Sequence, residues 1–176
     1  MWRQGYPATG MKQIVADAEA PFGSVYHFFP GGKEELGAEA VRWAGQFYGD
    51  LVDSIFGASD HDLPTTMRDV FASAGDTLTM VDFADACPVA TVSLEMSSVS
   101  EPIRQACAAV FDDWVGRLSE RFVMAGVPAD RSRDLATTFV MLLEGAFLLA
   151  RAHRSVDPLR AAGETMVLAT IDALSG

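Results

Sequence analysis

Residues 9–36 read TGMKQIVADAEAPFGSVYHFFPGGKEEL and contain two short helical patterns separated by a break. The first pattern places Met11, Ile14, Val15 and Ala18 at offsets of about 0, 3, 4 and 7, which brings them onto one face of a helix. We expect Thr9 to be the N-cap, its hydroxyl accepting an amide of the first turn. A short amphipathic helix is therefore predicted at about residues 11–18.

The second pattern follows the break at residues 19–21 and turns Val25, Phe28 and Phe29 inward. Residues 30–32, Pro-Gly-Gly, end it, because proline disfavours a helical predecessor and paired glycines fit a turn. Two short helices joined by a tight turn are typical of a helix-turn-helix DNA-binding unit.

A longer helix is predicted from Lys33 onward, because one apolar stripe continues over several turns. We interpret it as a connector that packs on both an N-terminal head and a larger body. The stripe consists of Leu36, Ala40, Trp43, Ala44, Phe47, Leu51 and Ile55.

The remaining chain predicts five more helices and no strand, so the expected fold is all-α with about eight helices. Their starts are marked by Pro64, Pro88, Pro102 and Pro158, and by the polar residues before the apolar stretch 135–150. We divide the chain into a head at residues 1–47, which includes the start of the connector, and a body at residues 48–176.

The composition, 49% apolar and 21% charged, is that of a packed globular protein. The formal charge of -11 is unusual for a DNA-binding protein, yet residues 1–49 hold four basic and five acidic side chains, so most of the excess lies in the body. Residues 50–85 hold eight carboxylates against Arg68 alone. We interpret them as a solvated face; repulsion of DNA by this face is the alternative.

Several classes of function lack their sequence signals. There is no secretory signal, and the apolar stretch 135–150, interrupted by Glu144, is interpreted as a buried helix too short to cross a bilayer. Cys87 and Cys107 are expected to be reduced thiols of a cytoplasmic protein. The three histidines are scattered, so we expect no metal. Without a nucleophile elbow, phosphate loop or acidic pair, we expect neither an enzyme nor a cofactor.

The segments GYPATGMKQI (5–14), GSVYHFFP (23–30) and KEEL (33–36) closely resemble the head of the TetR family. Residues 30–33 (PGGK), 86–89 (ACPV) and 142–146 (LLEGA) resemble the lincomycin-resistance-type regulators within that family. The resemblance implies a homodimeric transcriptional repressor with a helix-turn-helix head. It also implies a body that binds a small ligand, which releases the protein from its operator.

The resemblance also places DNA-contacting residues, whose hydroxyl, phenol, imidazole and ammonium groups can bond phosphate oxygens. A lysine in the first turn of a helix opposes the helix dipole, at about 0.3–1 kcal/mol, and a nearby phosphate would offset this. The alternative is a solvated lysine neutralised by Glu34 and Glu35. The implied residues are Thr9, Ser24, Tyr26, His27 and Lys33.

Two positions and one segment depart from the family pattern. Glu19 stands where the family has a glycine, at a turn that tends to require positive φ. Phe22 stands where a basic or small polar residue is common, and offers apolar contact, for example to a thymine methyl. The family's first helix is implied ahead of Gly5, where only residues 1–4 are found; a misassigned start, a shortened chain and a natural variant are all open explanations.

The body offers aromatic and thioether side chains that could line an apolar ligand pocket, although such residues are usually core. Glu144 among apolar neighbours needs a polar partner, or faces the ligand and favours a cationic or hydroxylated one. The candidates are Phe83, Met96, Phe111, Trp114, Met141, Glu144 and Phe147.

The apolar helix at 135–150 and the amphipathic last helix are expected to form a homodimer seam with their symmetry mates. Two heads about 34 Å apart would then read half-sites one helical turn apart. The alternative function is a TetR-like ligand-binding dimer that has lost operator binding.

Overall fold

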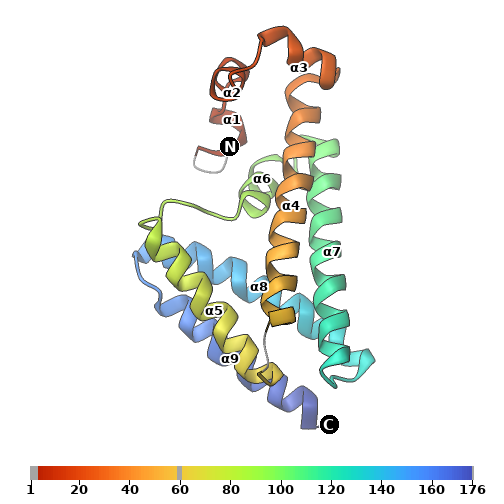
Figure 1. Ribbon diagram of the computed structural model, residues 1–176, viewed down its shortest axis with the longest axis vertical. Coiled ribbons are helices and arrows are strands. Elements are labelled where there is room, and N and C mark those ends of the chain that lie inside the picture. Colours follow the sequence, from red (N-terminus) through yellow and green to blue (C-terminus); the bar gives the residue numbers. More distant parts are fainter. Residues whose placement is uncertain (1–3, 59–60, 176) are drawn as a thin grey trace. The chain divides into compact units, whose positions relative to one another are not determined.

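The computed structural model describes residues 4–58 and 61–175, and within them it contains nine α-helices and no strand (Figure 1). The all-helical prediction is confirmed. The predicted helices are all present, and α1 is an additional one whose four residues are too few to show an apolar period. The helices are α1 (Gly5–Ala8), α2 (Met11–Asp17), α3 (Phe22–Phe28), α4 (Gly32–Ala58), α5 (Leu63–Met80), α6 (Pro88–Met96), α7 (Glu101–Met124), α8 (Ala129–His153) and α9 (Asp157–Ser175).

The chain forms two compact units. The head unit comprises Met1–Phe47 with Cys87–Phe111, and the body unit comprises Tyr48–Ala86 with Asp112–Gly176. Both α4 and α7 therefore contribute residues to each unit. The functional division of the chain after residue 47 stays a prediction. No local pattern predicts that residues 87–111 pack with the head.

The body unit is built on large apolar side chains. α5 and α8 both pack against α9. Phe71 of α5 meets Phe139 of α8 edge-on, with ring centroids 5.3 Å apart. The close packing of α9 depends on Gly163, since a Cβ at this position would lie 2.9 Å from the Cβ of Phe71.

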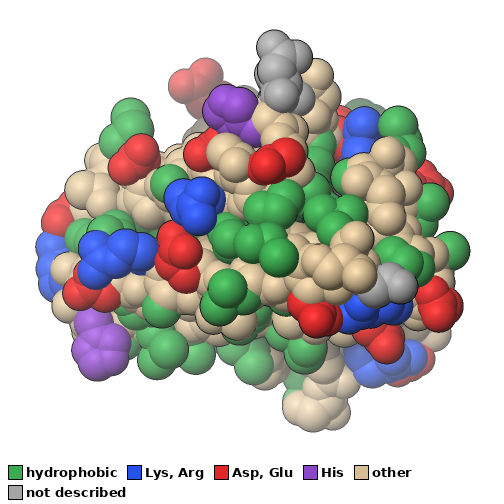
Figure 2. All heavy atoms as spheres, turned by 90° about the horizontal axis from the view of Figure 1, so that it is seen from below, with side chains coloured by type: hydrophobic (Ala, Val, Ile, Leu, Met, Phe, Trp, Pro, Cys, Tyr) green, Lys and Arg blue, Asp and Glu red, His purple; other side chains and the backbone are tan. Residues whose placement is uncertain are grey.

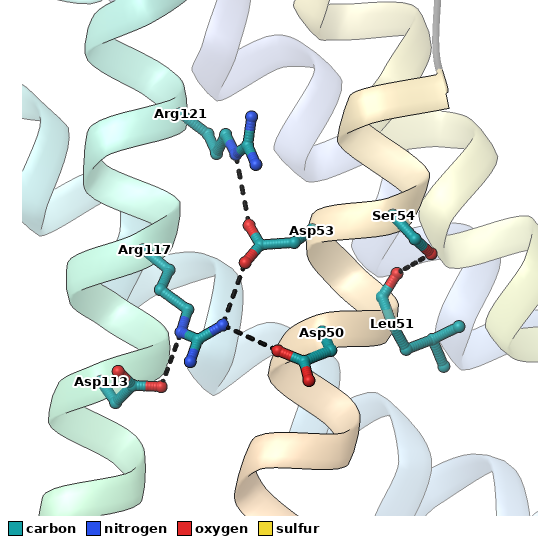
Figure 3. Close-up of polar contacts among 7 residues, drawn as sticks. All are labelled: Asp50, Leu51, Asp53, Ser54, Asp113, Arg117 and Arg121. Atoms are coloured by element: carbon teal, nitrogen blue, oxygen red, sulfur yellow. Dashed lines mark hydrogen bonds and ion pairs between the residues drawn. The ribbon is translucent and has the colours of Figure 1, made fainter.

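The C-terminal half of α4 is held to α7 by an ion-pair network within the body unit (Figure 3). The Arg117 guanidinium lies 2.8 Å from Asp113, 3.0 Å from Asp53 and 3.1 Å from Asp50. Arg121 contacts the second oxygen of Asp53 at 3.2 Å. These carboxylates raise the pKa of Arg117, the hydrogen bond to Asp53 contributing most.

The interpretation of residues 50–85 as a solvated face holds for most of the acidic side chains described, which are exposed, but Asp53 and Asp85 are half-buried. Asp50 and Asp53 are bound by α7 arginines more than sixty residues away, which no local charge count could show. Asp62 caps α5, accepting the Thr65 amide at 2.9 Å. Much of this acidic charge therefore has a structural partner.

The head unit has a smaller core in which the large side chains of α4 are not the buried ones. Trp43 and Phe47 are 63% and 50% exposed and stack on each other, with ring centroids 5.8 Å apart. α4 approaches α7 so closely that a Cβ on Gly45 would lie 2.5 Å from Val110, which leaves no room for large residues. The buried face of α4 here consists of Gly37, Ala38, Val41, Ala44 and Gly45. The predicted stripe is therefore wrong for Trp43 and Phe47, and also for Leu51, which is 46% exposed.

α8 corrects another expectation. Among the described residues it is the one helix that is long and apolar enough, by length and composition, to cross a membrane. The stretch 135–150 was expected to be too short to cross a bilayer, but the whole helix has 25 residues, so its length does not exclude a span. Only 28% of its most apolar stretch is buried within one chain, and the expectation that a partner chain covers the other side stays a prediction.

Candidate nucleic-acid interface

α2 and α3 pack against each other, and each has one buried side chain, Val15 in α2 and Val25 in α3. The turn between them returns sharply, with the Ala20 amide donating to the Val15 carbonyl at 2.9 Å. Glu19 within this turn has a φ of 51°, the left-handed conformation that glycine adopts without strain. The positive φ implied for this position is confirmed.

The exposed surface of α3 is mostly aromatic. Phe22 and Tyr26, one helical turn apart, are 46% and 53% exposed and touch edge-on, with ring centroids 5.9 Å apart. His27 is exposed beside them and lies edge-on to Phe28, 5.0 Å between centroids. A phenol, an imidazole and two phenyl rings therefore face outward from the helix.

Phe28 corrects a prediction, because its side chain is 69% exposed and does not point inward. α3 ends at this residue, and Phe29 leaves the helix with φ -130° and ψ 77°. The helical period predicted that Phe28 and Phe29 both point inward. Of the two, only Phe29 is half-buried.

Ser24 is half-buried at the start of α3, and its hydroxyl donates to the Pro21 carbonyl at 2.6 Å. The hydroxyl proton is thus used locally, while the oxygen can still accept a hydrogen bond. Ser24 therefore stabilises the first turn of α3 as well as lying near its outer surface.

Thr9 is buried and is not the N-cap of α2. The N-cap is Gly10, with no side-chain cap, and the Thr9 hydroxyl instead donates to the Gly5 carbonyl at 2.6 Å. No local pattern predicted α1, and it is α1 that supplies this competing acceptor. A DNA contact by Thr9 stays a prediction, and its burial makes little of its surface available.

Lys33 holds α1 to the start of α4. Its ammonium donates to the Tyr6 carbonyl at 2.8 Å, lies 3.4 Å from the Pro7 carbonyl, and sits 4.4 Å from the centre of the Tyr6 ring. Two of its three N–H groups are thus directed at α1, which leaves one for an outside acceptor. Burial, with a smaller effect of the Glu34 carboxylate, raises the pKa of Tyr6.

α1 is fastened from α6 as well. The Tyr6 amide donates to Glu95 at 2.7 Å, across 89 residues of sequence. At the start of α7 the Ser100 hydroxyl donates to Glu34 of α4. Glu95 is thus a structural partner of α1 that could not be predicted, since no local pattern relates it to residue 6.

Comparison with known proteins identifies this arrangement. The profile described as "Bacterial regulatory proteins, tetR family" matches residues 1–40, and "Transcriptional regulator LmrA/YxaF-like, C-terminal domain" matches residues 65–165, more than half of the chain. The chain belongs to the TetR family. It is a transcriptional regulator of this family, which consists of regulators rather than enzymes, and the resemblance found in the sequence is confirmed.

Relatives of the same family extend over nearly the whole chain. A helix-turn-helix-type transcriptional regulator of Mycobacterium tuberculosis (strain H37Rv) is 35% identical over 89% of this chain and 80% of its own length. The HTH-type transcriptional regulator LmrA of Bacillus subtilis is 29% identical, covering 89% of this chain and 82% of the relative. Among solved structures, the regulatory protein TetR from Rhodobacter sphaeroides superposes with a TM-score of 0.81 and 26% identity, covering 94% and 90% of the two chains.

The TetR-type head also contains a cation that the sequence analysis passed over. Lys12 is exposed on α2, and it is the one lysine or arginine in α2 and α3, against Asp17. Its exposure and charge suit a phosphate contact. Counting charge by helix rather than over the whole head would have singled it out.

The predicted ligand residues fall in both units. In the body unit Phe83 and Phe147 pack against the same core, and Arg151, one turn beyond Phe147, donates to the Phe83 carbonyl at 3.3 Å. Glu144 is half-buried on α8. Trp114 is also half-buried in this unit, whereas Met96 and Phe111 are half-buried in the head unit.

α8 and α9 expose a second apolar surface, the seam face. It consists of aliphatic and thioether side chains that are all classed as exposed, Met141 among them at 62%. Figure 2 shows one face of the molecule, on which hydrophobic side chains lie exposed among acidic and basic ones. The residues of the seam face are Met141, Leu148, Leu149, Leu168, Ile171 and Leu174.

Proposed function

We propose that the chain is a cytoplasmic repressor that binds a pseudopalindromic operator as a homodimer and leaves it when a small apolar or aromatic ligand binds. The observation that carries the proposal is the exposed surface of α3 on a TetR-type head. Tyr26 and His27 present hydrogen-bonding groups there beside Phe22. In helix-turn-helix proteins the second helix of the unit enters the major groove.

The head residues take different roles in this proposal. Tyr26, His27 and Lys12 contact the duplex directly, the last two at phosphates. Ser24 accepts a hydrogen bond while holding the first turn. Lys33 binds the α1 carbonyls and gives its remaining N–H to a phosphate, and Thr9 contributes chiefly by fixing α1.

The homodimer forms through the seam face. Large aliphatic side chains are exposed on both α8 and α9, and only 28% of the most apolar stretch of α8 is buried. Extended exposed apolar patches on soluble proteins mark interaction sites. A second copy related by a two-fold axis would cover the same residues on both chains. Met141 lies on this face with Leu148, so its exposure supports a dimer contact rather than a ligand contact.

The ligand binds in the body unit, where Phe83, Trp114, Glu144 and Phe147 are the candidate contacts; Met96 and Phe111 belong to the head unit and are not part of this site. The loop after α5 is suited to change its conformation when a ligand binds, because Asp82 and Phe83 both have positive φ, at 50° and 58°. Arg151 of α8 and Arg154, the C-cap that follows it, hold the same loop. A ligand that prefers one arrangement of this loop would shift the population of DNA-binding dimers.

Selection from a random double-stranded DNA library, followed by fluorescence anisotropy on the enriched sequence, tests the proposal. We expect enrichment of an inverted repeat, weaker binding by His27→Ala and Lys12→Ala, and release by a subset of neutral and cationic aromatic compounds. His61→Ala, an exposed histidine beside α5, is the matched control and should bind normally.

The second candidate function is a ligand-binding dimer without operator binding. It is favoured by the low positive charge of the head, where α2 and α3 together hold Lys12 against Asp17. A dimer that binds aromatic compounds but enriches no DNA sequence would establish this function and contradict the repressor.

A further inference from the structure

The first turn of α3 contains a glycine, Gly23, that the packing of the helix does not explain. Gly23 lies inside the helix, and apart from its two chain neighbours and the backbone of its own helix no described atom lies within 4 Å of a Cβ built on it; its φ is not positive. Neither crowding nor backbone conformation therefore requires glycine there. Glycine within a helix is destabilising by about 0.5–1 kcal/mol relative to alanine. Its remaining benefit is that another surface can approach the backbone closely.

Phe22 stands next to this bare stretch of backbone. Nearly half of its side chain is exposed, and its ring is held by the edge of Tyr26, 5.9 Å away between centroids. A ring supported from one side and open on the other presents a fixed apolar surface rather than a mobile one. The pair Phe22 and Gly23 thus forms an apolar surface with room for close approach.

The other side chains of α3 limit what it can read. The helix, FGSVYHF, has no Arg, Lys, Asn or Gln, the residues that recognise guanine or adenine edges with two hydrogen bonds. Phosphates offer no attraction to a phenyl ring. Among the major-groove edges of the four bases, the thymine C5-methyl is the apolar group.

We propose that Phe22 determines operator specificity by packing against a thymine methyl in each half-site, with Gly23 allowing the helix to approach and Tyr26 holding the ring. The inference rests on the proposed DNA binding and adds the base that is read. Phe22 lies at the first position of α3, the end of a recognition helix that contacts base edges.

Replacement of thymine by deoxyuridine in the selected operator tests this directly, because it removes the methyl and leaves every hydrogen-bonding group in place. We expect one symmetric pair of thymines at which deoxyuridine weakens binding about fourfold per half-site, the worth of one buried methyl. Deoxyuridine at thymines elsewhere in the site should have little effect.

The Phe22→Ala variant completes the test. We expect weaker binding to the thymine operator and no difference between thymine and deoxyuridine at the sensitive position. Phe28→Ala, which removes an exposed ring at the other end of α3, is the matched control and should keep the difference. Circular dichroism of each variant should match the parent, and selection with the variant should no longer favour thymine at that position.

The outcomes distinguish a failure of the thymine contact by Phe22 from a failure of DNA binding itself. Equal affinity for thymine and deoxyuridine at every position, or a Phe22→Ala variant that still discriminates between them, overturns the inference and leaves DNA binding standing. Weaker binding by Phe22→Ala without a methyl effect means that the ring contacts DNA in another way, and also overturns it. Failure of the wild-type chain to enrich any DNA overturns both.

Discussion

The molecule exposes two apolar surfaces of different chemistry. The seam face on α8 and α9 is aliphatic, with leucine, isoleucine and methionine spread over long helices. The α3 surface is aromatic, covers a helix of seven residues, and mixes rings with hydroxyl and imidazole groups. Aliphatic side chains offer only burial, which suits a second copy of the chain, whereas rings with polar edges can contact bases and phosphates. Two exposed apolar surfaces therefore need not have the same kind of partner.

The largest effect is expected from a charge introduced into the seam face. Leu148→Glu would place a charge in an aliphatic interface without a partner, so we expect the dimer dissociation constant to rise at least about a hundredfold. Sedimentation equilibrium measures it. Met80→Glu, at an exposed position on α5, is the control and should remain dimeric. An unchanged dimer in Leu148→Glu would remove the seam face from the interface.

A smaller effect concerns the packing that supports the seam face. Gly163→Ala would put a Cβ 2.9 Å from Phe71, so we expect the free energy of unfolding to fall by about 1–3 kcal/mol. Gly116→Ala on α7, where no described atom lies within 4 Å of the new Cβ, should instead raise it by about 0.5–1 kcal/mol. Urea denaturation of both variants compares them. Equal changes in the two would mean that α5 and α9 are not closely packed.

In the head, the strained turn below the α3 surface predicts a modest gain. Glu19→Gly should raise the free energy of unfolding by about 0.5–1 kcal/mol, because glycine adopts the φ of 51° without a Cβ clash. The thermal midpoint of the purified protein reports it. Ala16→Gly, inside α2, is the control and should lower the midpoint. A lower midpoint in Glu19→Gly would show that this turn is not strained.

The smallest expected effect concerns an exposed ion pair, that of Glu101 with Arg104. Hydrogen bonds from Arg104 and then Gln105 lower the pKa of Glu101 to about 2 from an ordinary 4.5, although the carboxylate is exposed. Any stabilisation from the pair is present above pH 4.5 and is lost as the pH falls through 2. An NMR titration should find this low midpoint, and Arg104→Ala should raise it. An ordinary midpoint in the wild-type chain would contradict the pairing.

Much of the fold follows from local rules in the chain. Proline positions and apolar periods predicted eight of the nine helices described, and the motif at residues 23–30 identified the family. The positive φ at Glu19 was also implied by the motif and is confirmed. Helix formation and tight turns depend on neighbours within about four residues, which is the range that a linear pattern reports.

Contacts between distant segments were decided by the tertiary structure alone. Periodicity assigned Trp43 and Phe47 to the buried face of α4, but the close approach of α7 admits only small residues there. The chain gives no local sign that Glu95 would bind the Tyr6 amide, or that Arg117 would join three aspartates. The sequence by itself therefore determined which segments are helical and which family they belong to. Which faces are buried, and which charges are paired, depends on segments brought together from far apart in the chain.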